Sequence, residues 1–291
     1  MTVVFNDFSL NGQFKTNDDF SEYVRSVLLN VLEIMNDRSI PLLSSYSTYS
    51  CLVTGTTTLY DLLSGKFNDP VFTVLKKELV QLAFAPYWSE VPCTRDDVKY
   101  EYPLCGVDEP NCFTEAISRR NPMFSICPSE FGSEIECKED DLYVEIVNIS
   151  DKNKLLEEYL KDSSDMIYVL NNFDFGIEVQ TVSIDGKCYA KEALDENNLI
   201  LDDYLKILEA SKWVVDGIKN NRSSHYSKHI EDDIYEMRVG ISASREFRLF
   251  FVTYNGIKFI NGFVKKTQNT PKSEKDKAKN IRDMCLARGK K

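Results

Sequence analysis

Hydrophobic residues recur at helical spacing in two segments near the start of the chain. Between residues 17 and 36, apolar side chains fall every three or four positions after a Thr-Asn-Asp start, which is typical of an amphipathic helix with a capped first turn. These positions are Phe20, Val24, Val27, Leu28, Val31, Leu32 and Met35. The segment 71–85 has similar spacing and ends at Pro86, which cannot continue a helix. Both segments are predicted to bury one face in a core.

The middle of the chain combines a strand pattern with helical and irregular segments. Residues 142–149 form a nearly continuous apolar run that predicts a buried strand, and a helix is predicted over 151–161. From 90 to 137, proline, cysteine, aspartate and asparagine accumulate, which indicates irregular structure with one helix near 113–120. Residues 1–172 are therefore predicted to form a mixed α+β domain.

A second domain is predicted over 173–291. Its expected elements are a strand at 176–183, a helix at 201–220 and three strands at 234–239, 246–252 and 257–264. Asn255-Gly256 between the last two strands favours the positive φ angles of a tight hairpin. Pro271 then opens a basic helix. The predicted fold class is α+β, with a small antiparallel sheet and flanking helices in the second domain.

Charge is distributed unevenly along the chain. The whole sequence has a net charge of −11, but the 70 residues from Arg222 to Lys291 contain 16 Lys and Arg against 8 Asp and Glu. The remainder contains 19 against 38, so a net +8 segment follows a net −19 segment. This asymmetry indicates that the C-terminal part meets a polyanion such as RNA or DNA. The alternative is a basic helix face that is merely solvated.

Composition excludes several classes of protein. Apolar residues make up 43% of the chain, which is typical of a globular protein. No apolar run approaches the roughly 18 residues that span a bilayer, and the N-terminus lacks a signal-peptide pattern, so a cytoplasmic location without membrane contact is predicted. The eight cysteines form no CxxC pair, and the spacing of Cys105, Cys112, Cys127 and Cys137 does not match a zinc knuckle. Neither a metal nor a cofactor is predicted.

Motifs in the last third of the chain resemble a known toxin superfamily. The strand sequences IYEMRV and EFRLFFV precede Gly262-Phe263-Val264-Lys265-Lys266-Thr267-Gln268, and Thr270-Pro271-Lys272 and Glu274 follow. This order is similar to the RelE/HigB superfamily, specifically its phage-derived HigB-like branch. The resemblance extends from roughly Lys228 to Ile281.

The resemblance implies a ribosome-associated endoribonuclease that cleaves mRNA and that a protein antitoxin inhibits. It places Arg248 at the family's phosphate-contacting strand arginine, Arg238 at a second basic strand position, and Lys265 and Lys266 at the end of the last strand. Lys258 and Lys272 are further candidates for binding phosphate. Cleavage through the 2′-hydroxyl needs a base, an acid and cations around the phosphate, but no metal. Arg248 alternates with Phe247, Leu249 and Phe251, so its side chain is predicted to point away from their face.

The sequence does not determine which residues act as the general acid and the general base. His225 and His229 are the two histidines of the chain, and an imidazole has an unperturbed pKa near neutrality. Both fall in a predicted loop, and either can be a solvated residue without a role. The sequence also departs from the family, because CLARGKK lacks a Tyr or His near the end of the last helix and Glu236 stands where several relatives carry lysine.

These departures keep a second hypothesis open, namely a non-catalytic module that binds RNA or protein on a RelE-like fold. The acidic domain 1–172 is predicted to regulate the second domain, either by covering its basic surface or by sensing a phage-derived trigger. A role in phage defence would fit such a fusion. The oligomeric state does not follow from the sequence.

Overall fold

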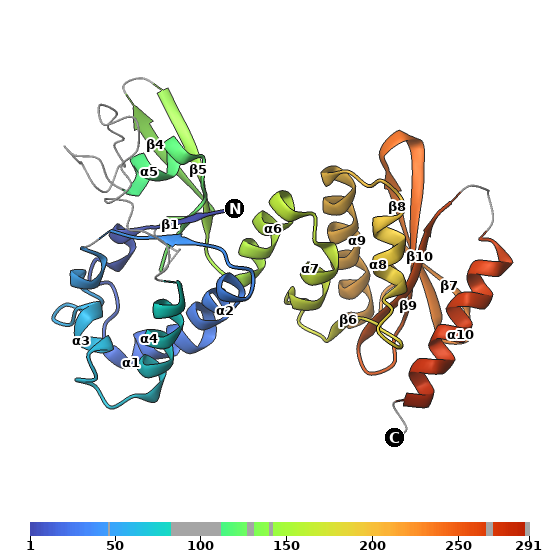
Figure 1. The fold of residues 1–291 in the computed structure, drawn as a ribbon, viewed down its shortest axis with the longest axis horizontal. Coiled ribbons are helices and arrows are strands. Elements are labelled where there is room, and N and C mark those ends of the chain that lie inside the picture. Colours follow the sequence, from blue (N-terminus) through green and yellow to red (C-terminus); the bar gives the residue numbers. More distant parts are fainter. Residues whose placement is uncertain (46, 83–111, 127–130, 140–141, 266–269, 289–291) are drawn as a thin grey trace. The chain divides into compact units, whose positions relative to one another are not determined.

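The computed structural model describes residues 1–45, 47–82, 112–126, 131–139, 142–265 and 270–288 (Figure 1). The chain forms two compact units, Met1–Leu155 and Leu156–Lys291. Their division precedes the domain boundary predicted between residues 172 and 173, and it falls within the helix α6, Lys152–Ser163. Each unit has its own sheet and core.

The first unit is built on a five-stranded sheet with the order β2-β1-β3-β5-β4. The strands are β1 Val3–Phe5, β2 Leu42–Leu43, β3 Met123–Phe124, β4 Glu134–Glu139 and β5 Leu142–Ile149. The helices are α1 Asn17–Tyr23, α2 Leu29–Asp37, α3 Leu59–Leu63, α4 Pro70–Leu82 and α5 Cys112–Arg119. All strand pairs are parallel except β4 with β5.

The predicted helices and the predicted strand of the first unit are confirmed where the structure describes them, but β3 and most of β4 lie in the segment 90–137, which was predicted to be irregular apart from one helix. The helix predicted over 17–36 runs through α1, the π-helical turn Val24–Leu28 and α2. Thr16 and Asp19 form a reciprocal capping box at its start, in which each side chain accepts the other residue's backbone N–H. The strand predicted over 142–149 is β5, while the part of the 71–85 helix after Leu82 lies outside the described residues.

The second unit carries a five-stranded sheet with the order β6-β10-β9-β8-β7. The strands are β6 Val179–Thr181, β7 Ser227–Glu231, β8 Ile234–Ile241, β9 Arg245–Val252 and β10 Ile257–Val264. The helices after α6 are α7 Met166–Asn172, α8 Tyr189–Asp195, α9 Leu201–Lys219 and α10 Lys272–Arg288. Strands β7 to β10 are antiparallel and β6 is parallel to β10, so the predicted α+β fold is confirmed.

Helices α9 and α10 lie on opposite faces of this sheet (Figure 1). Helix α9 lies against β8, where the Ser211 hydroxyl lies 3.7 Å from the sulfur of Met237. Helix α10 contributes Ala278 and Ile281 to a cluster with Ile234 and Phe250, which lie on the other face. The site described below is on the α10 face.

One segment predicted as a loop is a strand. β7 pairs antiparallel with β8 through Ser227 opposite Met237 and His229 opposite Tyr235, so His229 lies in a strand while His225 lies in the preceding loop. The sequence SKHIE has one apolar residue, so it lacks the alternation of apolar and polar positions that predicts a strand. Its strand conformation depends on pairing with β8. The hairpin at Asn255-Gly256 is confirmed, with φ angles of 48° and 95°.

Replacing Asp203 with asparagine is expected to destabilise the protein by about 1–3 kcal/mol at pH 7. This buried carboxylate accepts hydrogen bonds from the Ser242 amide at 2.7 Å and the Ser242 hydroxyl at 2.8 Å, tying the start of α9 to the turn after β8. Burial opposes ionisation, but these bonds and Arg245 hold the pKa of Asp203 below its ordinary value of 3.8.

Because the pKa of Asp203 is lower in the folded state than in the unfolded state, the ionised carboxylate stabilises the fold at pH values above its unfolded-state pKa. This contribution is lost as the pH falls through the folded-state pKa. Urea unfolding of wild type and Asp203→Asn at several pH values measures the effect. The difference in free energy of unfolding between wild type and Asp203→Asn should shrink below about pH 4. An equal difference at pH 7 and pH 3 would contradict a role for the ionised carboxylate.

Candidate functional site

Arg248 lies at the centre of a buried ion-pair network on the α10 face of the sheet. Its side chain is 2% exposed. Its Nη1 donates to both Glu236 carboxylate oxygens, at 3.1 and 3.3 Å, and its Nε donates to Glu246 at 2.7 Å. Nη1 also contacts the Thr270 hydroxyl, which in turn donates to Glu236 at 2.7 Å. The guanidinium is therefore held from three sides.

Strand register explains why these groups meet. Arg238 of β8 stands opposite Arg248 of β9, which stands opposite Phe263 of β10, and directly paired residues share one face. Glu236 and Glu246 lie two residues before the two arginines, so they lie on that same face. Arg248 does point away from the face of Phe247 and Leu249, as predicted. Its own face is covered as well, so it is not the open cation that the sequence suggested.

Glu236 is the carboxylate that joins the two arginines. It is fully buried, and it accepts from the Nε of Arg238 at 2.8 Å as well as from Arg248. A buried carboxylate needs such partners because its desolvation is costly. Arg238 and Arg248 cancel Glu236 and Glu246 in formal charge, so the positive charge that remains in the network is that of Lys265.

Arg238 and Lys265 are the network cations with access to solvent. The Arg238 side chain is 32% exposed and that of Lys265 is 25% exposed, with its Nζ 3.5 Å from Glu246. Although burial opposes ionisation, the hydrogen bond from Arg248 and the charges of Arg248 and Lys265 lower the pKa of Glu246. Glu246 is therefore ionised at neutral pH and offsets part of the local positive charge.

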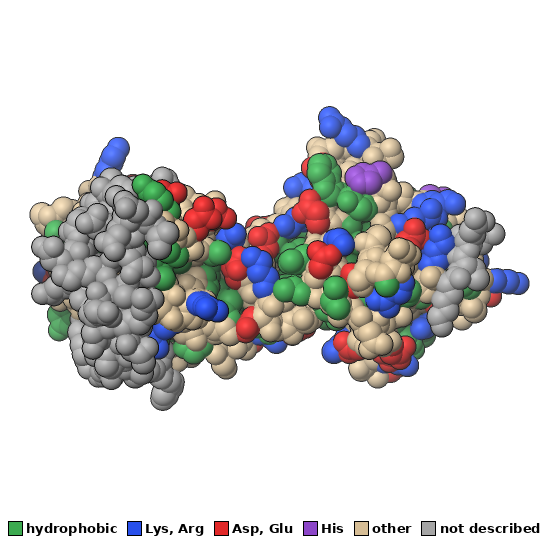
Figure 2. Space-filling view, turned by 90° about the horizontal axis from the view of Figure 1, so that it is seen from above, with side chains coloured by type: hydrophobic (Ala, Val, Ile, Leu, Met, Phe, Trp, Pro, Cys, Tyr) green, Lys and Arg blue, Asp and Glu red, His purple; other side chains and the backbone are tan. Residues whose placement is uncertain are grey.

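The remaining predicted phosphate-binding residues lie apart from this network or outside the residues that the structure describes. Lys258 pairs with Val252 at the far end of β9 from Arg248, so the structure does not bring it to the arginines. Lys272 is exposed in the first turn of α10. Lys266 lies outside the described residues. Figure 2 shows Lys and Arg side chains interspersed with Asp and Glu on the visible face of the second unit, rather than one continuous basic patch.

The two histidines lie in different surroundings. His229 is exposed, its Nε2 is 2.6 Å from the Asp232 carbonyl oxygen, and its ring contacts Tyr235 at 5.2 Å between centroids. Because Tyr235 is one residue from Glu236, His229 lies on the opposite face of the sheet from the arginines. His225 is exposed beside Tyr226, whose carbonyl accepts from the Arg238 amide at 2.8 Å. The ring centroid of His225 also lies 6.5 Å from that of Trp213 on α9, the helix that covers the face of the sheet away from the arginine side chains.

The sequence analysis missed three members of this neighbourhood, namely Thr270, Glu246 and Tyr226. A signal for one of them was present, because Glu236-Met237-Arg238 and Glu246-Phe247-Arg248 repeat the spacing Glu-x-Arg in adjacent strands. With strand alternation, that spacing puts each glutamate beside an arginine on one face. Thr270 has no such signal, since its position depends on how the chain enters α10.

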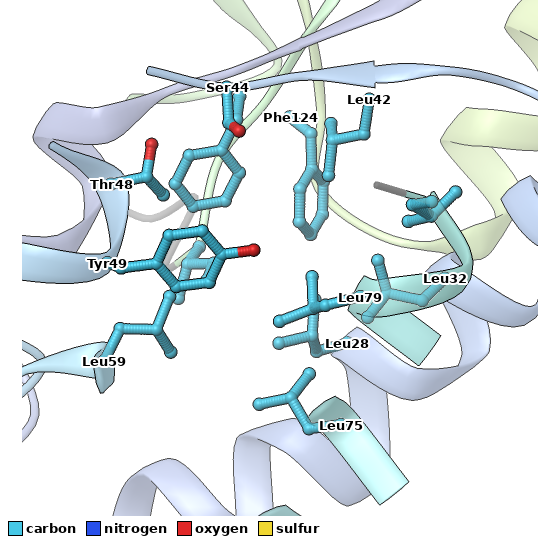
Figure 3. Close-up of a pocket in the computed structure, with 13 residues that line it drawn as sticks. Leu28, Leu32, Leu42, Ser44, Thr48, Tyr49, Leu59, Leu75, Leu79 and Phe124 are labelled. Carbon is cyan, nitrogen blue, oxygen red and sulfur yellow. The ribbon is translucent and has the colours of Figure 1, made fainter. Parts of the chain in front are cut away.

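The first unit contains a small apolar pocket of about 60 Å³ (Figure 3). Leu28, Leu32, Leu75 and Leu79 come from its helices, and the hydroxyl of Tyr49 projects into it from the other side. None of its lining residues is charged, so the pocket is not suited to a phosphate.

The described cysteines of the first unit are poor nucleophiles, because burial is the main cause that raises their thiol pKa. The pKa is about 11 for Cys51 and about 12 for Cys137, and burial also raises that of Cys112 well above its ordinary value. A thiol reacts as its thiolate, so these cysteines are not activated at neutral pH. Within the described ranges, no group of three or more His, Cys, Asp or Glu side chains is arranged to hold a metal ion. Cys105 and Cys127 lie outside those ranges.

Comparison with known proteins assigns part of the chain. Residues 201–283 match the family described as phage derived protein Gp49-like, which belongs to the RelE/HigB-like toxin superfamily. The match runs from α9 into α10 and includes every member of the arginine network. No curated protein and no solved structure matches the chain. Among the described helices, none is both long and apolar enough to cross a bilayer.

Proposed function

We propose that the second unit is a toxin of the toxin-antitoxin class that acts by cleaving mRNA. The observation that carries the proposal is the coincidence of the Gp49-like match with Arg238, Arg248 and Lys265 at one end of the sheet. Guanidinium groups suit phosphate oxygens because they donate two parallel hydrogen bonds. The family match supports a toxin, while RNA cleavage is our inference from these cations.

In this proposal the two arginines have different roles. Arg238 is partly exposed and has donors to spare, so it contacts the phosphate that gains charge during cleavage. Arg248 is a positioning residue, because its buried guanidinium holds Glu236 and, through it, the orientation of Arg238. Lys265 adds a cation at the end of β10. His225 is the candidate proton carrier, since it is exposed beside the residue that pairs with Arg238.

A second candidate function is a toxin-like fold that binds RNA or protein without cutting it. The buried Glu236 favours this alternative, because it occupies the arginine donors that a phosphate would otherwise use. The two functions differ in a measurable way. A binding module retains RNA but never produces new RNA ends.

The acidic first unit is proposed to regulate the second. Residues 1–155 contain 13 Lys and Arg against 24 Asp and Glu, a net charge of −11, and carboxylates can compete with phosphates for the same cations. The partners expected from this arrangement are mRNA and the ribosome, together with an antitoxin or a phage-derived trigger protein.

The test is cell-free translation with mapped mRNA ends. We expect new 5′ ends within translated messages when the full chain, or a fragment starting at Leu156 that unfolds cooperatively, is added. Cleavage by the fragment alone would support inhibition by the first unit. Absence of new ends with both proteins, together with retained RNA binding, would reject the enzyme and favour the binding module.

A further inference from the structure

Three aromatic rings lie together at the β7 edge of the second unit. The ring centroids of His225 and Tyr226 are 4.0 Å apart, and those of Trp213 and His225 are 6.5 Å apart. Trp213 is 51% exposed although indole is largely apolar, and His225 is exposed as well. An exposed ring cluster of this kind is a candidate binding surface.

The backbone fixes the position of these rings. The loop after α9 turns back tightly, with the Arg222 amide donating to the Gly217 carbonyl at 2.7 Å. A Cβ on Gly217 would approach the Arg222 carbonyl oxygen to 3.0 Å and the Ser224 side chain to 3.3 Å, so glycine permits this close approach. The loop therefore holds His225 against the C-terminal half of α9, where Trp213 lies.

The cluster begins beside the arginine site. The Arg238 amide donates to the Tyr226 carbonyl at 2.8 Å, which continues the β7–β8 pairing by one residue. Tyr226, His225 and Trp213 thus lead away from Arg238 around the sheet edge. The rings therefore extend from the residue paired with Arg238 to α9 on the other face of the sheet.

Two exposed cations flank His225, which lies in the loop before β7. Arg222 and Lys228 are exposed on either side of His225 in the chain, and neither takes part in an ion pair among those found in the described residues. Two carboxylates lie within about one helical turn of Trp213 on α9, namely the exposed Glu209 and Asp216, and Asp216 accepts a hydrogen bond from the Asn220 amide at 2.7 Å. The segment that carries His225 therefore has two exposed cations, which attract a polyanion.

We propose that Trp213, His225 and Tyr226 form a base-stacking surface for single-stranded RNA that continues from Arg238. The inference rests on the proposed action on RNA, and it specifies the unpaired strand as the form that is bound. Unpaired bases stack on exposed aromatic side chains, whereas bases inside a duplex are already stacked on one another. The rings are therefore expected to bind single-stranded RNA tightly and duplex RNA weakly.

Fluorescence of Trp213 in the full-length protein tests the proposal. The chain has two tryptophans, so Trp88→Phe leaves Trp213 as the single reporter. A single-stranded oligoribonucleotide of mixed sequence is expected to quench this fluorescence, and the same sequence annealed into a duplex is not. Trp213→Ala should weaken binding of the labelled single strand about 5- to 100-fold, as expected for losing one stacked base, and Trp213→Phe should lose less.

Tyr254→Ala is the matched control, because Tyr254 is 50% exposed on the β9–β10 turn of the same unit. It is expected to leave RNA binding unchanged. Unquenched Trp213 fluorescence at saturating RNA, or equal losses for Trp213→Ala and Tyr254→Ala, would overturn the stacking surface and leave the rings to a protein partner.

The outcome is separable from that of the proposed cleavage. If mRNA is cut but Trp213→Ala binds RNA like wild type, the stacking surface is wrong and the toxin activity stands. If Trp213 is quenched and no message is ever cut, the stacking surface stands and the enzyme is wrong.

Discussion

Replacing Glu236 with alanine is expected to lower the free energy of unfolding by about 3–5 kcal/mol. Glu236 is fully buried and is the shared partner of Arg238, Arg248 and the Thr270 hydroxyl. Removing it leaves Arg248, 2% exposed, with one carboxylate partner, Glu246, and opens a cavity where the side chain was. Urea unfolding of the full chain, followed by far-UV circular dichroism, measures the change.

Two further variants separate the loss of the charge pair from the loss of packing. Glu236→Gln keeps the volume and one acceptor, so we expect it to cost less than alanine. Glu236→Leu combined with Arg248→Met removes both charges and should recover part of the stability lost by either single change, because no buried charge is then left unpaired. Strictly additive losses in the double variant would show that Glu236 and Arg248 are not coupled.

Replacing Arg238 with alanine is expected to reduce mRNA cleavage about 100- to 1,000-fold, the usual effect of removing one donor to a developing negative charge. The fold should survive, because Glu236 retains Arg248 and the Arg238 side chain is 32% exposed. Mapped mRNA ends over a range of protein concentrations give the cleavage rate, and thermal unfolding checks the fold.

Lys258→Ala provides the control for Arg238→Ala, because it also removes one cation but lies opposite Val252, at the far end of the sheet from Arg248. We expect its cleavage rate to stay within a few-fold of wild type. Similar losses in both variants would mean that general charge, rather than the position of Arg238, governs the activity. Arg248→Ala is a poorer probe of the site, because removing this buried group leaves the fully buried Glu236 with one arginine partner, Arg238, and disturbs the fold.

Much of the second unit could be predicted from its sequence, because its strands and helices have strong local patterns. The alternation in β9 correctly predicted the face to which Arg248 points. Its burial could not be predicted in the same way, because it depends on α10 and Thr270 covering that face. Sequence patterns report which residues share a face, but not whether a distant segment covers it.

The histidines show the same limit. Both seemed equivalent as loop residues, but β7 pairing puts His229 on the face away from the arginines, while His225 stays beside Tyr226. A single-residue difference in register decides the face of a strand residue. The aromatic cluster of Trp213, His225 and Tyr226 joins α9 to the β7 edge, and no local pattern links those segments.

The buried arginine network also affects how tightly this unit can hold RNA as ionic strength changes. Each phosphate neutralised on a single strand contributes about −0.7 to the slope of log affinity against log salt concentration, because it releases condensed counterions. Arg248 is already compensated by Glu236 and Glu246, so it releases none. The measured slope should therefore count only solvent-facing cations such as Arg238, Arg222 and Lys228, and the net +8 of the C-terminal segment overstates the number of ions exchanged on binding.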